Sequence, residues 1–119
     1  MLKKKYRLKK DSAFNATYKL NHSVCDRNII VYLGKEKTDP SIPTKAGFVV
    51  SKKIHKRAVK RNRIKRLMRE VYRLMLKNGE ADFVQTKLSV IFIGRQDALK
   101  ANLSEIRNSV TTLLKKLNK

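Results

Sequence analysis

The chain of 119 residues has the length of one ordinary domain, and 41% of its residues are hydrophobic, so it can bury a core. Its 30 lysines and arginines against 9 acidic residues give a formal net charge of +21, which indicates a polyanionic partner, nucleic acid first and an anionic membrane surface second. The single cysteine excludes an intrachain disulfide, and no apolar run is long enough for a secretory signal or a membrane span, so we expect a cytoplasmic protein.

The chain begins with a basic arm over residues 1–10. Asp11 and Ser12 then offer an N-cap for a short helix, in which Phe14 and Tyr18 are four residues apart and share a face. The arm and this helix are expected to precede the sheet.

Strands follow. Residues 28–33 and 46–51 are rich in β-branched and aromatic side chains and predict strands, and residues 23–27 offer a further short one. Both prolines lie in the segment 34–44, which therefore predicts a loop. Residues 88–94 form another apolar strand.

Helical periodicity runs from residue 57 to 76 and stops before Gly79. Near the end, Asn102 and Glu105 form an N-x-x-E variant of the capping box, and an amphipathic helix follows them. The elements share one core, which predicts a single domain over 1–119 with an α/β, or α+β, two-layer sandwich.

The most basic stretch is KRAVKRNRIKRLMRE at 56–70. On a helix its apolar residues form one stripe, which should pack on the sheet. The opposite side collects Asn62, Arg66, Arg69 and Arg73, with Arg63 and Lys65 on the flanks. A solvated charged face would explain an ordinary basic run, but the cations here are almost unmixed, which favours phosphate binding. An interfacial membrane helix is less favoured because the core needs the apolar stripe.

A second group of candidate residues lies outside this helix. Lys52 and Lys53 follow a strand, and Phe14, Tyr18 and Tyr32 could stack on the bases of a single strand. Periodicity alone places core packing slightly ahead for these aromatics. The carboxylates are scattered, and neither a catalytic triad, an HExxH motif nor a phosphate-binding glycine loop is present. The residues therefore predict a nucleic-acid-binding module without catalytic residues of its own.

RNRIKRLMRE at 61–70, preceded by GFVVSKK at 47–53, resembles the bacterial ribonuclease P protein family. RLKKDSAFNATYK at 7–19 and RNIIVY at 27–32 match its opening pattern, so the resemblance covers nearly the whole chain. It implies an α-β-β-β-α-β-α order, with a mixed sheet and a left-handed crossover through the basic helix. The segment 78–87 is longer than the family pattern. Its Glu80 and Asp82 belong to a surface insertion or make a weak metal contact, and the insertion is preferred.

The resemblance also implies a function. Family members assist removal of the 5′ leader from precursor tRNA, while the RNA subunit is catalytic and uses divalent metal, chiefly Mg²⁺. No membrane partner and no stable homo-oligomer are expected. The positions implied to bind the catalytic RNA are Lys56, Arg57, Lys60, Arg61, Asn62, Arg63, Lys65, Arg66, Arg69 and Arg73. Those implied to bind the leader, in a cleft between the first helix and the sheet, are Arg7, Lys9, Lys10, Phe14, Tyr18, Tyr32, Lys52 and Lys53.

Two alternatives share the charge and size. A structural RNA-binding protein, such as a ribosomal component, does not explain the arrangement of SKK before RNR. A helix-based DNA binder requires a recognition helix exposed to the major groove.

Overall fold

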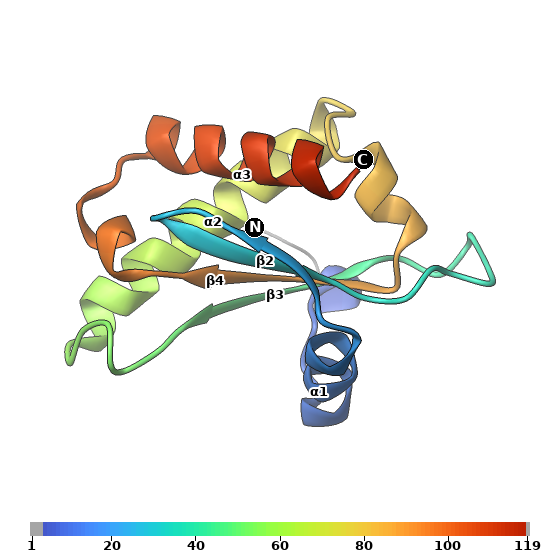
Figure 1. Cartoon of the computed structure of the whole chain (residues 1–119), viewed down its shortest axis with the longest axis horizontal. Coiled ribbons are helices and arrows are strands. Elements are labelled where there is room, and N and C mark those ends of the chain that lie inside the picture. Colours follow the sequence, from blue (N-terminus) through green and yellow to red (C-terminus); the bar gives the residue numbers. More distant parts are fainter. Residues whose placement is uncertain (1–3, 119) are drawn as a thin grey trace.

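The computed structural model describes residues 4–118, which form an α+β fold (Figure 1). The main elements are α1 (Asp11–Leu20), β1 (His22–Cys25), β2 (Ile29–Leu33), β3 (Lys45–Val50), α2 (Ala58–Lys77), β4 (Ser89–Gly94) and α3 (Leu103–Leu117). Three short 3-10 helices, η1 (Lys4–Tyr6), η2 (Asp82–Thr86) and η3 (Gln96–Lys100), complete the order. The predicted order of helices and strands is confirmed.

The four strands form one mixed sheet in the order β1-β2-β4-β3. The pairs β1–β2 and β2–β4 are antiparallel, whereas β3 and β4 are parallel. The basic helix α2 connects these parallel neighbours, since parallel strands need a long crossover connection. The predicted mixed sheet is confirmed, and the left-handed sense of the crossover stays a prediction.

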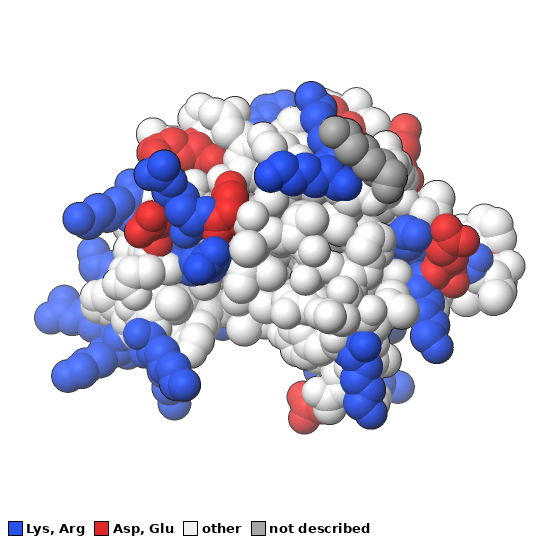
Figure 2. All heavy atoms as spheres, viewed as in Figure 1, with Lys and Arg blue, Asp and Glu red and all other residues white. Residues whose placement is uncertain are grey.

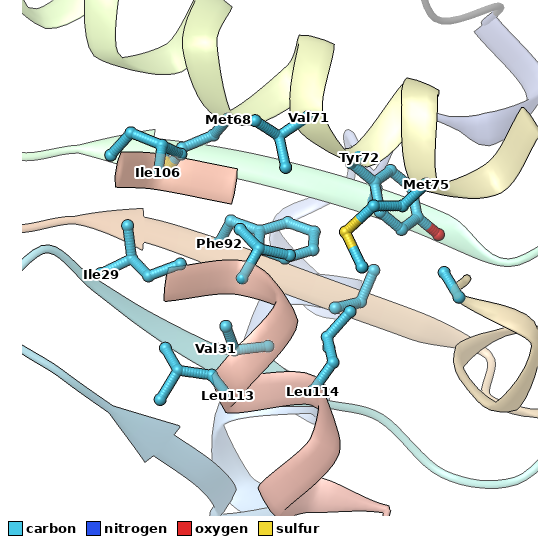
Figure 3. Close-up of a cluster of buried hydrophobic side chains, with 14 of the residues drawn as sticks. Ile29, Val31, Met68, Val71, Tyr72, Met75, Phe92, Ile106, Leu113 and Leu114 are labelled. Atoms are coloured by element: carbon cyan, nitrogen blue, oxygen red, sulfur yellow. The ribbon is translucent and has the colours of Figure 1, made fainter. Parts of the chain in front are cut away.

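The main core lies between the sheet and a layer formed by α2 and α3 (Figures 1 and 3). In β2, the alternate residues Ile29, Val31 and Leu33 are fully buried on this side. Phe92 of β4 is also fully buried and packs against Tyr72 of α2, with ring centroids 5.2 Å apart. Each such side chain contributes roughly 1.5–3 kcal/mol by its burial. The apolar stripe of α2 is therefore committed to the core, as its periodicity predicts.

The opposite face of the sheet carries α1, which Figure 1 shows below the strands. Two close contacts fix its position. The hydroxyls of Thr17 and Ser89 are 2.6 Å apart and buried, which joins α1 to β4. A Cβ at Gly47 of β3 would lie 2.6 Å from the Phe14 ring, so only glycine lets the helix approach this closely. This second face is the one on which the predicted aromatics lie.

Most predicted element ends agree with the structure. Asn102 and Glu105 form the predicted capping box, and Gly79 follows α2 with a φ of +73°. The predicted cap of α1 is wrong, because the helix already begins at Asp11 and its cap residue, Lys10, makes no side-chain cap hydrogen bond. Within residues 4–118, no helix is both long and apolar enough to cross a bilayer.

The segment 78–87 differs from the expected surface insertion. It contains η2, and both Ala81 and Val84 are fully buried in the main core. Glu80 forms an ion pair of 3.0 Å with Arg107 of α3. The segment therefore closes one end of the helical layer, because it supplies apolar side chains that the core packs around.

Candidate nucleic-acid interface

A cationic surface covers the start of α2 and the turn before it. Because Ile64 and Met68 hold one side of the helix in the core, the residues on the opposite side point to solvent. Five exposed residues form what we call the basic surface. Asn62 and Arg66 lie on this solvent side of α2, and Lys56, Arg57 and Lys60 surround the start of the helix. Figure 2 shows lysines and arginines gathered at its lower left, where Figure 1 places the 51–57 turn and the first part of α2.

The two arginines of the RNR motif are not part of this exposed set. Arg61 turns back along the chain, and its Nη1 donates to the carbonyl oxygens of His55 at 2.8 Å and Lys56 at 2.7 Å. The amide N–H of Arg57 donates to Nδ1 of His55 at 3.0 Å. These bonds fix the turn before α2, so Arg61 determines where the neighbouring cations lie.

Arg63 faces the other way, toward α3. Its Nη2 donates to the carbonyl oxygen of Ala101 at 2.9 Å, across the contact between α2 and the residues before α3. In the part of the chain that the structure describes, Arg63 Nη1 is the one buried side-chain nitrogen or oxygen without a hydrogen-bond partner. A partly buried guanidinium in this place acts as a bridge between two helical elements.

Three further cations of α2 are in contact with other side chains or half-buried. The Arg69 guanidinium lies 5.6 Å from the centre of the Phe48 ring, a cation–π contact. Arg73 donates to both carboxylate oxygens of Glu70, at 2.6 and 3.2 Å. This hydrogen bonding lowers the pKa of Glu70 and raises that of Arg73, so both stay charged. Lys65 is half-buried. The predicted basic side of α2 is thus most available to a ligand at its N-terminal end.

We expect Arg63→Met to lower the free energy of unfolding by about 1 kcal/mol. The substitution keeps much of the aliphatic stem but removes the hydrogen bond to Ala101. The cost of losing this charged hydrogen bond is offset in part, because the substitution also removes Nη1, a buried nitrogen without a hydrogen-bond partner. Urea unfolding monitored by circular dichroism measures the change. Arg66→Met, on the exposed side of the same helix, is the control and should leave stability unchanged. Equal stability of both variants would contradict the bridging role.

The predicted aromatics do come together, on the face of the sheet that α1 covers. The Tyr18 and Tyr32 rings meet edge to face with centroids 5.0 Å apart, and Phe14 lies 6.4 Å from Tyr18. All three rings are half-buried, so they pack α1 on the sheet and still offer surface. Burial first, and then the neighbouring Tyr32, raise the pKa of Tyr18.

Beside the rings lies an apolar strip that the sequence reasoning missed. Ile30, Ile93 and Val49 are paired neighbours on β2, β4 and β3, one pleat away from Tyr32. They point to the same side of the sheet as α1 but remain half-buried, because α1 covers only the next row, which contains Ile91. Strand alternation in 28–33 and 88–94 contained this signal, but only the register reveals the row. A base could lie on this strip.

The predicted leader-binding cations are divided between the two ends of β3. Arg7 bridges to Ala46 near the start of the strand, and the exposed Lys9 and Lys10 lead into α1. Lys52 and Lys53 are exposed in the turn after the strand. At about 3.3 Å per residue, the six residues of β3, Lys45–Val50, span roughly 17 Å. The apolar strip and the aromatic rings therefore lie between two groups of positive charge.

Three of the acidic residues form ion pairs at separate places on the fold. Among residues 4–118, no three His, Cys, Asp or Glu side chains gather where they could hold a metal ion. Glu36, Glu70 and Glu80 instead pair with nearby cations. The described side chains are suited to binding a polyanion.

Comparison with known proteins identifies the family. The model of the family described as Ribonuclease P matches residues 2–118. The chain belongs to the ribonuclease P protein family. The ribonuclease P protein component of Clostridioides difficile (strain 630) is 35% identical over 109 residues, which is 92% of this chain and 89% of the relative. That of Staphylococcus epidermidis (strain ATCC 35984) is 38% identical over 114 residues, 96% of this chain and 91% of the relative.

Solved structures of ribonuclease P proteins share the fold. The Staphylococcus aureus RNase P protein superposes with a TM-score of 0.74 at 35% identity, covering 93% of this chain and 94% of that one. The Thermotoga maritima RNase P protein, at 24% identity, has a TM-score of 0.73 over 92% of this chain and 96% of its own, which supports the fold. As a member of the ribonuclease P protein family, the chain is expected to work with an RNA partner.

Proposed function

We propose that this chain is the protein subunit of a ribonuclease P, which binds the catalytic RNA and the 5′ leader of precursor tRNA and assists removal of that leader. The observation that carries the proposal is the presence, in a ribonuclease P family member, of two separate surfaces suited to RNA. One is the basic surface at the start of α2. The other is the apolar strip with its aromatic rings, between the two groups of cations along β3.

The basic surface is assigned to the catalytic RNA. Its exposed lysines and arginines can bind phosphates, and Asn62 adds a donor and an acceptor for base edges or ribose. Arg61 and Arg63 contribute by holding the turn and the helix in place. Such a surface recognises a folded RNA by shape and charge, which suits a large structured partner.

The face with α1 is assigned to the leader. Single-stranded nucleic acid is bound by aromatic side chains that stack on bases and by cations that follow the backbone. Phe14, Tyr18 and Tyr32 provide the rings, and Lys52 and Lys53 lie at the far end of β3. A mature tRNA lacks the leader, so this surface would distinguish substrate from product.

Mg²⁺ is assigned to the RNA subunit. The carboxylates of the described chain are spread over the surface or paired with cations, and this donor set does not fit a protein-held catalytic metal. The protein's part is to bind, to position the substrate and to supply positive charge, which lowers the metal concentration the holoenzyme needs. We expect the complex to act in the cytoplasm without a stable homo-oligomer of the protein.

Reconstitution with a bacterial catalytic RNA tests the proposal. Leader removal from precursor tRNA is followed with and without the protein across a Mg²⁺ titration. We expect the protein to stimulate cleavage most strongly at low Mg²⁺, because its cations replace part of the screening that metal otherwise provides. Absence of stimulation at every Mg²⁺ concentration would contradict the proposed function.

A further inference from the structure

An apolar side chain lies in the middle of the basic surface. Val59, in the first turn of α2, is 74% exposed. The other exposed large hydrophobic residues of the described chain are 39–43% exposed: Leu20, Ile42, Leu88 and Leu103. Isolated exposed apolar residues are common on protein surfaces. The position and surroundings of Val59 separate it from those.

Val59 shares a helix face with two residues of the basic surface. Asn62 follows it by three positions and Arg66 by seven, which places all three side chains in one row along α2. A shallow depression is lined by this row together with the flanking cations: Val59, Asn62, Lys65, Arg66 and Arg69. A valine therefore forms one end of a depression whose other walls are polar or cationic.

Packing of the core does not explain the valine at this position. The core side of the same helix begins at Ile64, which is fully buried, whereas Val59 contacts solvent over most of its surface. Valine also has a lower helix propensity than the lysines and arginines around it, so it does not favour the first turn. Phosphate binding alone would be served equally well by a polar side chain at this position.

We propose that Val59 packs against the base or ribose of an unpaired nucleotide in the RNA that the basic surface binds. The inference rests on the proposed function and specifies the kind of RNA involved. A continuous duplex presents phosphates and hides the faces of its bases, while unpaired nucleotides expose apolar ring faces that protein side chains can cover. Cations on either side of Val59 would hold the flanking phosphates.

Binding of a bacterial catalytic RNA by Val59 variants tests this inference. Val59→Ala should weaken binding by about three- to tenfold, because it removes two methyl groups from a contact that becomes partly buried. Val59→Thr, which keeps the branched shape and a similar helix propensity, should weaken it about threefold. Val59→Ile should bind at least as well as the parent. Ile42→Ala, at an exposed apolar residue in the 34–44 loop, should bind normally.

The salt dependence separates this contact from an electrostatic one. A contact without charge releases no counterions, so log–log plots of affinity against salt for the Val59 variants should run parallel to that of the parent. An unaltered affinity in Val59→Ala and Val59→Thr would overturn the inference, and so would a change of slope. The midpoint of thermal unfolding should be unchanged in all four variants, since both sites are exposed. A lowered midpoint in Val59→Ala or Val59→Thr would mean that Val59 stabilises the fold, and it would overturn the inference.

Cross-linking identifies the nucleotide. Val59→Cys in a Cys25→Ser background carries a short photo-reactive group on its single thiol. We expect cross-links at unpaired nucleotides of the catalytic RNA, and cross-links confined to continuous duplex would overturn the inference. Arg66→Ala in the same binding assay tests the proposed function separately from the role of Val59. Loss of binding in this variant supports RNA binding by the basic surface, even if the Val59 variants bind normally.

Discussion

Replacement of Phe14 by alanine is expected to weaken binding of precursor tRNA by about 5- to 150-fold and to leave mature tRNA nearly unaffected. Stacking of one base on an aromatic side chain contributes roughly 1–3 kcal/mol. The Phe14 ring is half-buried between α1 and Gly47, so it is held in one orientation and has little entropy left to lose when a base covers it. Mature tRNA lacks the segment that would reach this ring.

The measurement is the dissociation constant of the reconstituted holoenzyme for each of the two tRNAs. Asn15→Ala is the matched control, because Asn15 is the next residue of α1 but is exposed. Thermal unfolding of Phe14→Ala shows whether α1 remains on the sheet. Equal losses for precursor and mature tRNA, in a variant that remains folded, would contradict the assignment of this face to the leader.

Arg66→Ala is expected to weaken binding of the catalytic RNA about tenfold at low salt, a loss typical of one charge-assisted hydrogen bond. The log–log salt slope should become shallower by about 0.7–0.9, the value for one phosphate contact. Arg66 is exposed on the basic surface, beside the depression at the start of α2. Its removal therefore deletes a contact without disturbing the core.

Lys77→Ala is the control for charge alone. Lys77 is an exposed cation in the last turn of the same helix, well away from the basic surface. Binding is measured by filter retention or fluorescence anisotropy over a series of salt concentrations. The same reduction in slope for both variants would mean that the RNA responds to net charge and not to this surface. The Arg66→Ala slope would then contradict the proposed interface.

Local sequence signals were sufficient for much of the fold. The capping box at Asn102 and Glu105, the glycine after α2 and the apolar run in β4 each depend on neighbours in the chain, and each lies where the sequence predicts it. The segment 78–87 was misjudged because its two buried residues, Ala81 and Val84, are too few and too small to form a periodic pattern. Their burial depends on where α2 and α3 end.

The candidate site was predicted less completely, because side-chain direction depends on contacts distant in sequence. Helical periodicity places Arg61 at the border of the apolar stripe, but it cannot show that the guanidinium turns back to two carbonyl oxygens. The partner of Arg63, Ala101, is 38 residues away. The apolar strip depends on the register of three strands, which no single stretch of sequence contains.

The strand β3 connects the two proposed RNA surfaces. Its start packs against α1, it pairs with β4 along its whole length, and its end leads into the turn that Arg61 fixes. The number of residues in β3 sets the distance from the α1 end of the proposed leader surface to the basic surface. The strand would thus act as a molecular ruler between the leader and the catalytic RNA. Nucleotides of the leader would then be selected by their distance from the cleavage site, in the same way for leaders of different sequence.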